Sequence, residues 1–526
     1  MEKCFLKTCR ILYGIVMGSI LCLLLICGHI NYFLQHNPPP ANYYIFVAWA
    51  AVIIIGITVY FAYTHKKSHP HRIHFFSPTR NLIIIASFLL LIGQLYVCYN
   101  CFFTTGWDVF YVQTAATEWA AGRYELDDSF LAYYSSYPNN LLLTFITTII
   151  LKLNAVIGVF QEPYAMMSTV VISCMINTGT CILVYKTALL FTKPCFAAIG
   201  YLAAVLTIGV SPWSIIFYSD AAALGIPLLV IYLFLRPTVN RISHLVCRCL
   251  AAAVAMIGYF IKPQCIFPLL GAAILYAVRF RRPFSLKYFR QPVAVLLTCA
   301  VTMIGVQTLI DIGCKKVDFH PDPEKALGAA HFFMMSHNSE YNGAYVLDDV
   351  LFSQSIPTSS ERTRQNLLIA FQRIQEMGFI GNLQHLKYRM LGAFNDGTFA
   401  FGREGMFYRY ISPPPNTRVA PVLRSLYFPS GQAHQLYFYF AQTMWIGVLL
   451  LSTISCLTKK NNPCNRFLPI FWITILGLVA YEMLFEVRAR YVYIFVPLFC
   501  VLAAVGMETL CSFIQRRCYS FQKRKV

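Results

Sequence analysis

Long apolar runs separated by short polar loops make up most of this chain. Twelve runs are interpreted as membrane-spanning helices, for which the hydrocarbon core of a bilayer sets a length of roughly 20 residues. They lie at 11–34, 43–63, 81–101, 166–190, 196–211, 221–235, 246–261, 263–278, 292–310, 436–456, 467–485 and 491–511. The pattern predicts an all-α membrane protein with about twelve transmembrane helices.

A thirteenth run, NNLLLTFITTIILKL at 139–153, decides the predicted topology. Cytoplasmic loops carry an excess of Lys and Arg. If this run lies in the outer interface, 25 of the 42 Lys and Arg residues fall on the inner side, against only two acids, Glu2 and Glu508. If it spans the membrane, the later basic loops and the basic tail turn outward. We therefore predict that 139–153 is an interfacial helix and that both termini are cytoplasmic.

Composition agrees with a multi-pass protein of the cell membrane. The chain is 58% hydrophobic and 12% charged, whereas soluble proteins average about 25% charged residues. The net charge of +20 is attributed to the basic cytoplasmic loops rather than to nucleic-acid binding. The 19 cysteines are scattered through apolar runs and are interpreted as small hydrophobic residues rather than disulfide partners.

The runs divide the chain into five predicted parts. These are two extra N-terminal transmembrane helices (1–63), a transmembrane core (64–310) with its first outer loop at 102–165, an extracytoplasmic loop domain (311–434), C-terminal transmembrane helices (435–511) and a basic cytoplasmic tail (512–526). The loop domain holds 11 of the 22 acids and 12 basic residues. Within it, RTRQNLLIAFQRIQEMG from Arg362 predicts a surface helix, and FNDGTFAFGREGMFY from Phe394 predicts a loop rich in turns.

This topology brings six charged residues from different loops to the outer face. They are Asp108, Asp220, Lys262, Glu486, Arg488 and Arg490. Charges at the membrane boundary are costly, and they mark functional sites more often than charges elsewhere. We therefore expect the active site, if there is one, to be extracytoplasmic.

Each of these residues also has a purely structural interpretation. Two acids, Asp108 in GWDVFY and Asp220 in FYSDAA, are either helix caps or carboxylates of one site. In the second case Asp108 is a general base, and its burial would raise its pKa. Lys262 in YFIKPQ is either a snorkelling lysine or a cation for a phosphate. In EVRARY, Glu486 and an arginine form a local ion pair, or Arg488 and Arg490 bind phosphate, to which guanidinium geometry is suited.

Two further motifs offer polar groups for a substrate. YSSYPNN either begins a helix at its proline or places Tyr137, Asn139 and Asn140 beside Asp108 as hydrogen-bonding groups for a sugar. The turn-rich loop offers Asp396 and Glu404, either as substrate contacts or as parts of a structural turn.

In their order and shared side, these motifs resemble the GT-C superfamily of integral membrane glycosyltransferases, in particular bacterial members that use polyprenyl-phosphate sugars. The motifs are GWD at Asp108, YPNN at Tyr137, FYSD at Asp220 and EVRARY at Glu486, and the resemblance covers 81–511. The chain departs from the family in having YPNN in place of a Pro-Pro pair and in lacking a DxD motif.

The resemblance implies a GT-C-like fold in which outer juxtamembrane helices accompany the spans. It implies inverting transfer of a sugar from a polyprenyl-phosphate donor to a glycan or glycolipid acceptor, with membrane lipid as the surroundings and no nucleic-acid partner. The implied roles are catalysis for Asp108 and Asp220, donor phosphate binding for Arg488, Arg490 and Lys262, and substrate binding for Tyr137, Asn139, Asn140, Glu486, Tyr491, Asp396 and Glu404. No metal ligand is assigned and no cofactor is expected with certainty, although a divalent metal stays open.

Two other functional classes stay open beside this one. A lipid-linked glycan transporter would favour charges in the middle of spans and inverted repeats. A polysaccharide polymerase or ligase also works with arginines and a large loop at the outer face, so the sequence separates it poorly from a monosaccharide transferase.

Overall fold

The computed structural model describes residues 2–29, 42–65, 80–161, 164–279, 286–413, 416, 418–458 and 462–523. Helices make up 78% of the structure. Within the described ranges, the sheet consists of two short antiparallel strands, β1 (Phe103–Thr104) and β2 (Tyr410–Ile411). The expectation of an all-α membrane protein is confirmed at this level.

Nine helices within those ranges are long and apolar enough to cross a membrane. Eight of them coincide with predicted runs, and the ninth is the helix that begins at Pro138. The long helices are α1 (Glu2–Cys27), α3 (Arg80–Asn100), α6 (Leu141–Ile157), α7 (Met167–Ala188), α11 (Arg241–Ile261), α13 (Leu286–Lys316), α18 (His434–Ile454), α19 (Leu468–Leu484) and α21 (Val496–Lys523).

The other four predicted runs fall on shorter apolar helices, so the expected number of twelve spans stays a prediction. Two of these runs are interrupted by turns: a π turn at Val205–Gly209 and a break at 223–225. These helices are α2 (Asn42–His65), which is counted as short only over Asn42–Ile55, and α8 (Pro194–Ala204), α9 (Ser219–Ala222), α10 (Ile226–Leu235) and α12 (Phe267–Arg279). The basic loop at 66–79, on which the predicted orientation partly depends, lies outside the described residues.

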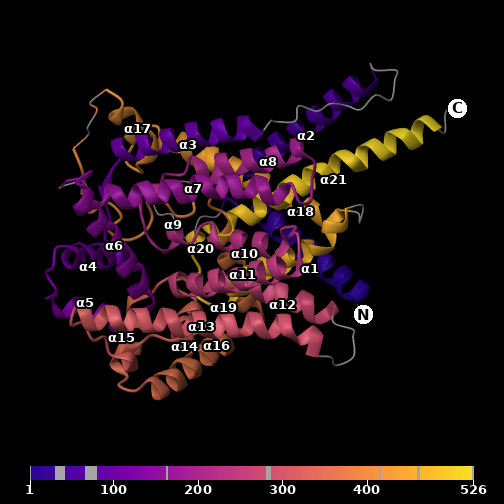
Figure 1. Cartoon of the computed structure of the whole chain (residues 1–526). Helices are drawn as coiled ribbons and strands as arrows, with labels where there is room; N and C mark the ends of the chain where they lie inside the picture. Colours follow the sequence, from indigo (N-terminus) through magenta and orange to yellow (C-terminus); the bar gives the residue numbers. More distant parts are fainter. Residues whose placement is uncertain are drawn as a thin grey trace.

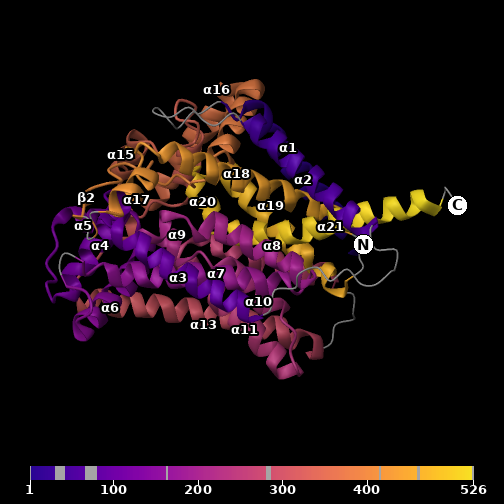
Figure 2. The ribbon, with the colours of Figure 1, turned by 90° about the horizontal axis from the view of Figure 1, so that it is seen from above.

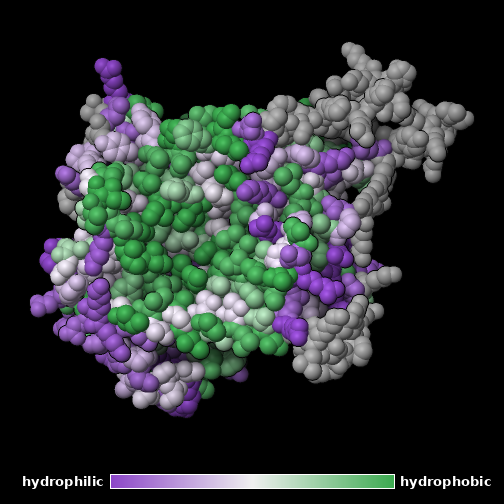
Figure 3. All heavy atoms as spheres, viewed as in Figure 1, coloured by the Kyte–Doolittle hydropathy of each residue, from purple (hydrophilic) through white to green (hydrophobic). Residues whose placement is uncertain are grey.

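The remaining helices are not among these candidate spans, and they gather largely at one end of the molecule. They are α4 (Trp107–Ala120), α5 (Asp128–Ser136), α14 (Ala329–Ser336), α15 (Leu347–Ser355), α16 (Ser359–Phe394), α17 (Ala420–Tyr427) and α20 (Ala489–Tyr493). We call the end that carries α4, α5, α15 and α17 the loop end; both chain termini lie at the opposite end (Figures 1 and 2). An apolar belt separates the two polar ends on the face shown in Figure 3, as expected of a protein surrounded by lipid.

Helix α6, on which the predicted topology depends, lies at the loop end beside α4 and α5 in both ribbon views (Figures 1 and 2). One face, which includes Thr144 and Leu151, is buried, while Ile149 and Leu153 are more than half exposed. This amphipathic burial fits a helix that lies in an interface, and its length also fits a span. Its interfacial placement therefore stays a prediction.

The loop domain is held together by a buried arginine. The helix predicted from Arg362 is confirmed as part of α16, which bends at Gly378, where φ is 59°. The Arg362 guanidinium donates hydrogen bonds to four backbone carbonyls, those of Ser353, Ile356, Glu324 and Ala326. One side chain thereby satisfies carbonyls from several loop segments that would otherwise be buried without partners. The predicted loop from Phe394 to Tyr408 is confirmed as a series of turns.

Several contacts join the loop domain to the spans and their first outer loop, and two of these junctions involve backbone groups near the site. Arg389 of α16 is 1% exposed, and its Nη2 donates to the carbonyls of Glu482 at 2.8 Å and Phe485 at 2.5 Å. These carbonyls belong to the end of α19, where the helix leaves its last acceptors without internal partners. The second junction is the β1–β2 pair, in which Phe103 faces Ile411.

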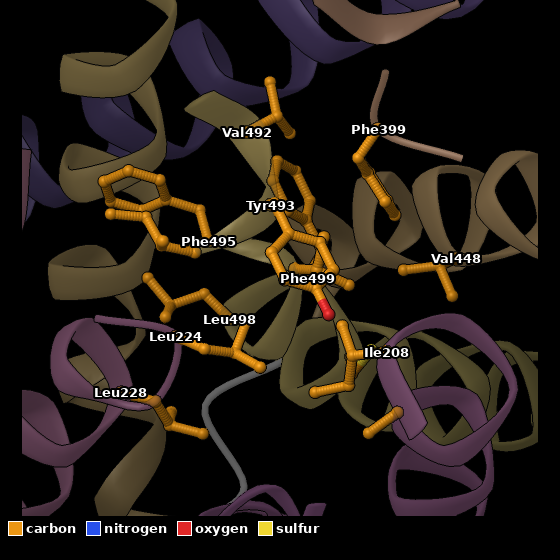
Figure 4. Close-up of a cluster of buried hydrophobic side chains, with 14 of the residues drawn as sticks. Ile208, Leu224, Leu228, Phe399, Val448, Val492, Tyr493, Phe495, Leu498 and Phe499 are labelled. Carbon is orange, nitrogen blue, oxygen red and sulfur yellow. The ribbon is translucent and has the colours of Figure 1, made fainter. Parts of the chain in front are cut away.

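The largest hydrophobic core lies around the start of α21, directly after α20. Tyr493, Phe495 and Phe499 are at most 1% exposed, and they pack among side chains of the neighbouring spans and of the turn-rich loop, including Phe399 (Figure 4). The five residues of α20 are thus anchored by the core on one side. This anchoring matters because α20 also carries Arg490.

Replacing Gly506 by alanine tests the packing of α18 against α21. A Cβ atom at Gly506 would overlap the backbone carbonyl of Leu451. We expect Gly506→Ala to lower the free energy of unfolding by about 1–3 kcal/mol, the usual cost of overpacking, measured as a lower Tm of the detergent-solubilised protein. The control is Gly93→Ala in α3, where a Cβ would meet nothing within 4 Å; equal Tm values for the two variants would contradict the packing.

Candidate functional site

The GWD motif forms the start of α4. Gly106 is the N-cap, its amide donates to the carbonyl of Met406 at 2.8 Å, and a Cβ at this position would collide with Met406. Trp107 has a φ of 45°, a strained value for a bulky residue and of the kind that clusters at functional sites. Asp108 is the second helical residue and makes no capping hydrogen bond. The interpretation of Asp108 as the helix cap is therefore wrong.

Arg490 is the centre of the site. Its Nη2 lies 3.9 Å from Oδ2 of Asp108, its Nη1 lies 3.9 Å from Oδ2 of Asp220, and its Nε lies 3.4 Å from Oε1 of Glu404. The three carboxylates come from α4, α9 and the turn-rich loop, and the Arg490 side chain is only 8% exposed. The indole of Trp107 lies 4.5 Å from the guanidinium carbon, in cation–π contact. Among the described residues, Nε and Nη1 have no hydrogen-bond partner.

Asp220 and Lys262 form a buried ion pair. Their side chains are 1% and 5% exposed, and Nζ of Lys262 donates directly to Oδ1 of Asp220. Two structural interpretations from the sequence are therefore wrong: Asp220 does not cap α9, whose N-cap is Tyr218, and Lys262 does not snorkel to the surface. Lys262 also lies 4.8 Å from the centre of the Tyr491 ring.

Glu486, Arg488 and Tyr491 form a second group within EVRARY. Nε of Arg488 lies 3.4 Å from Oε1 of Glu486, and the hydroxyl of Tyr491 donates to Oε2 at 3.0 Å. The local ion pair expected of this motif is thus formed by Arg488, whereas Arg490 points to more distant carboxylates. Burial raises the pKa of Glu486, and Arg488 and Arg490 partly offset this effect.

Exposure distinguishes the carboxylates around Arg490. The side chain of Asp108 is 36% exposed, against 1% for Asp220 and 7% for Glu404. Burial raises the pKa of Asp108 above the ordinary value, although Arg490 and hydrogen bonds from Tyr133 and Tyr218 oppose the shift. Burial also raises the pKa of Glu404, but nearby cations, above all Arg490, outweigh it and the net pKa is lowered. Asp108 is therefore the carboxylate with both the access and the basicity to accept a proton from a bound molecule.

A hydrogen-bonded group of side chains supports Asp108, and two of its tyrosines were not anticipated from the sequence. The hydroxyl of Tyr218 lies 3.4 Å from Oδ2 of Asp108 and 3.2 Å from Oδ1 of Asn140. Nδ2 of Asn140 donates to the hydroxyl of Tyr133 at 2.7 Å. Tyr218 is part of the FYSD motif, so the motif could have identified it as a residue of the site. Tyr345, whose hydroxyl feels the charges of Asp108 and Glu486, carries no signal in the sequence.

Two predicted substrate contacts, Tyr137 and Asn139, form no hydrogen bond with Asp108 among the described residues. Tyr137 is half-buried and packs on Tyr133, and burial together with the charges of Tyr345 and Asp108 raises its pKa. Asn139 is exposed, with a 3.4 Å contact to its neighbour Asn140.

Asp396 belongs to the structure of its own loop rather than to this group. Its carboxylate accepts hydrogen bonds from the amide and hydroxyl of Thr398, the amide of Ala400 and Nη1 of Arg403. Four donors satisfy both oxygens, so the structural-turn interpretation of Asp396 is correct and its role as a substrate contact is not supported.

The side chains around Arg490 do not form an evident binding site for a divalent metal ion. Within the described part of the chain, no group of three or more His, Cys, Asp or Glu side chains is arranged to hold a metal ion. The carboxylates that a metal would need already face Lys262, Arg488 and Arg490. These cations supply the positive charge that a metal would otherwise bring.

The chain matches a protein family over nearly its whole length. A family model described as "Conserved hypothetical integral membrane protein" matches residues 3–511, nearly the whole chain. No curated protein matches the chain.

Removing the Arg490 guanidinium tests its place at the centre of the site. We expect Arg490→Met to lower the free energy of unfolding by about 3–5 kcal/mol, because the carboxylates of Glu404 and Asp220 lose a buried partner. Thermal unfolding in detergent measures the loss. The control is Arg409→Met, directly after the turn-rich loop, because Arg409 is exposed and lies over the ring of Phe110.

A second substitution separates charge from packing. If Glu404 depends on Arg490, then Arg490→Met combined with Glu404→Gln recovers part of the lost stability, since the orphaned charge is gone. Strictly additive losses from the two substitutions would show that the pair does not interact.

Proposed function

We propose that this chain, which belongs to the family of conserved hypothetical integral membrane proteins, is a membrane glycosyltransferase. It transfers a sugar from a polyprenyl-phosphate donor to a hydroxyl of a glycan or glycolipid at the loop end. The observation that carries the proposal is Asp108, an accessible carboxylate of raised pKa that lies 3.9 Å from a buried arginine. The resemblance of GWD, YPNN, FYSD and EVRARY to GT-C enzymes supports it.

The proposed reaction is a single displacement. Asp108 accepts the proton of the acceptor hydroxyl, and the hydroxyl oxygen forms a bond to the anomeric carbon of the sugar. The bond between that carbon and the phosphate oxygen breaks, and polyprenyl phosphate leaves with the electron pair, so the configuration inverts. Nη2 of Arg490 faces the accessible Asp108 and is suited to the departing anion, whereas Nε and Nη1 are buried against Glu404 and Asp220.

The arrangement of charges favours an enzyme over a transporter. The ion-paired cluster is formed by residues at the ends of helices, such as Asp108 and Arg490, rather than by residues in the middle of a span. A polysaccharide polymerase or ligase would use the same groups, and it differs in taking a preassembled chain on a polyprenyl diphosphate. A panel of donors therefore distinguishes these two reactions.

Replacing Asp108 by asparagine tests the general base. We expect Asp108→Asn to lower kcat by about 10²–10⁴-fold, the usual contribution of a general base, while expression and Tm stay close to wild type. Transfer from radiolabelled polyprenyl-phosphate sugars is measured with purified protein, and surface glycans are compared in complemented deletion strains. Asp128→Asn, an exposed first-turn acid of α5, is the control. Wild-type turnover by Asp108→Asn would rule out this role.

The pH profile tests the environment of Asp108. The base must be ionised, so kcat/KM falls as the pH drops through the raised pKa of Asp108, which lies above the ordinary value of 3.8. Tyr218→Phe removes a hydrogen bond that favours the carboxylate, and we expect the acid limb to move to higher pH. In the control Tyr134→Phe the lost hydroxyl bonds Thr144 instead, and the limb stays in place. A limb that does not respond to Tyr218→Phe would assign the titration to another group.

A further inference from the structure

An arginine without an acidic partner lies inside the membrane-spanning helix α11, far from the candidate active site around Arg490. Lys262 follows α11 directly and pairs with Asp220 in that site, so the start of α11 at Arg241 points to the opposite end of the molecule. We call this end, which also carries both termini, the terminus end (Figures 1 and 2). Arg248 lies about 10 Å from the start of α11 at 1.5 Å per residue. Charges inside a span are costly and indicate a functional site by default.

Arg248 lies among side chains of four neighbouring helices. The helices α10, α12 and α13 pack against α11. The guanidinium carbon lies 4.7 Å from the centre of the Phe234 ring, in the last turn of α10. The hydroxyl of Tyr276 on α12 and the ring of His244, one turn earlier on α11, both feel the charge of Arg248. Nε2 of Gln291 on α13 lies 3.2 Å from Nδ1 of His244. These side chains thus form one polar group between the helices.

The group offers hydrogen-bond donors but no negative charge. Nε of Arg248 is buried and has no hydrogen-bond partner among the described residues. The amide nitrogen of Gln291 can only donate, so Nδ1 of His244 accepts and the neutral ring carries its proton on Nε2. Snorkelling does not account for this arginine, because a snorkelling side chain keeps its charged head in water, whereas this Nε is closed off from solvent.

No acid of the chain is placed to neutralise Arg248. The sequence has no Asp or Glu from 221 to 310, a stretch that includes α10, α11, α12 and most of α13. The two acids predicted on the terminus side interact with other cations. Glu2 pairs with Arg279 at 3.1 Å, and Glu508 feels the charge of the lysine that precedes α8. A counter-ion for the guanidinium therefore comes from outside the chain.

The position of the group favours a lipid phosphate as this counter-ion. The guanidinium lies at the level of the last turn of α10, where the span ends and phospholipid headgroups begin. Two exposed arginines, Arg241 and Arg290, begin α11 and precede Gln291 on α13. On the same face of α13 as Arg290, Leu297 and Val301 are more than half exposed and can contact acyl chains. Basic pockets between transmembrane helices are suited to anionic headgroups, and a guanidinium to phosphate oxygens.

We propose that Arg248, His244 and Gln291 line a binding site for the phosphate of an anionic phospholipid in the leaflet at the terminus end. This site is separate from the candidate active site and does not depend on sugar transfer. A lipid bound there contacts α11 and α13 at one end, while the other end of α11 leads to Lys262 and its partner Asp220. The lipid thereby stabilises the helices that hold this ion pair.

Lipid binding to the full-length protein tests the site. Protein stripped of lipid in detergent is titrated with phosphatidylglycerol, bound lipid is counted by native mass spectrometry, and Tm is followed in parallel. We expect one tightly retained phosphatidylglycerol and a higher Tm, because a ligand of the folded state stabilises it. Phosphatidylcholine, whose headgroup has no net charge, should bind about tenfold more weakly. Equal binding of phosphatidylcholine, or an equal rise in Tm with sodium phosphate alone, would overturn the proposal.

Replacing Arg248 by methionine removes the guanidinium and keeps an unbranched side chain. We expect Arg248→Met to lower the affinity for phosphatidylglycerol about tenfold, equivalent to about 1.4 kcal/mol, and to reduce the lipid-dependent rise in Tm. Lys7→Met is the matched control, because it removes one exposed positive charge from α1 at the same end and should leave binding unchanged. Wild-type affinity in Arg248→Met, or an equal loss in Lys7→Met, would contradict the site.

A map of the wild-type protein decides the question even if Arg248→Met does not fold. A phosphatidylglycerol with a diazirine in its headgroup is photo-crosslinked to the protein, and the labelled peptides are identified by mass spectrometry. We expect labels on 241–252 of α11 and 290–297 of α13, and labels confined to other helices would rule out the site. Asp108→Asn should give the same labels as the wild type, because Asp108 lies at the loop end.

Discussion

The burial of one guanidinium among carboxylates from distant parts of the chain is the constraint on which the site depends. Arg490 faces Asp108, Asp220 and Glu404 at 3.4–3.9 Å, and each acid belongs to a different element. A buried charge without partners costs several kcal/mol, so these elements must come together when the chain folds. The hydrophobic core around the start of α21 fixes α20 and therefore Arg490. The acids from the other elements are placed around this fixed guanidinium.

The balance of charge explains why Asp108 differs from the other acids. Among the charged residues that the motifs placed at the site, four are carboxylates, Asp108, Asp220, Glu404 and Glu486, and three are cations, Lys262, Arg488 and Arg490. One negative charge therefore lacks a full partner. The deficit falls on Asp108, which has its cation at 3.9 Å and 36% of its side chain open. Burial raises the pKa of Asp108 and its single cation offsets this only in part, while the open part of the side chain gives access to a ligand; together these features make this residue the best candidate for a base.

Buried arginines also position the loop domain, by a different mechanism. Arg362 and Arg389 donate mainly to backbone carbonyls rather than to carboxylates. The last carbonyls of a helix have no N–H partner within that helix. A guanidinium at this position therefore donates to acceptors that would otherwise be unpaired. In this way the loop domain is fixed to the end of α19, only a few residues before Glu486 and Arg490. The domain is therefore part of the frame of the site, and Glu404 is its contribution to the charged cluster.

The sequence by itself determined the local features of this protein. Within the described residues, each of the twelve predicted apolar runs coincides largely with helix, because hydropathy and helical periodicity depend on neighbouring residues. The motifs also identified Asp108, Asp220, Lys262, Glu404 and Arg490 as members of one site. Only the tertiary structure decided their roles, since burial and pairing depend on residues that are remote in the chain. Asp220 and Lys262 neutralise each other, Asp396 stabilises its own loop, and Tyr218 and Tyr133 support Asp108. A charge pattern shows that acids and bases share an end of the molecule, but contacts at a few ångströms determine which of them stays open to a substrate.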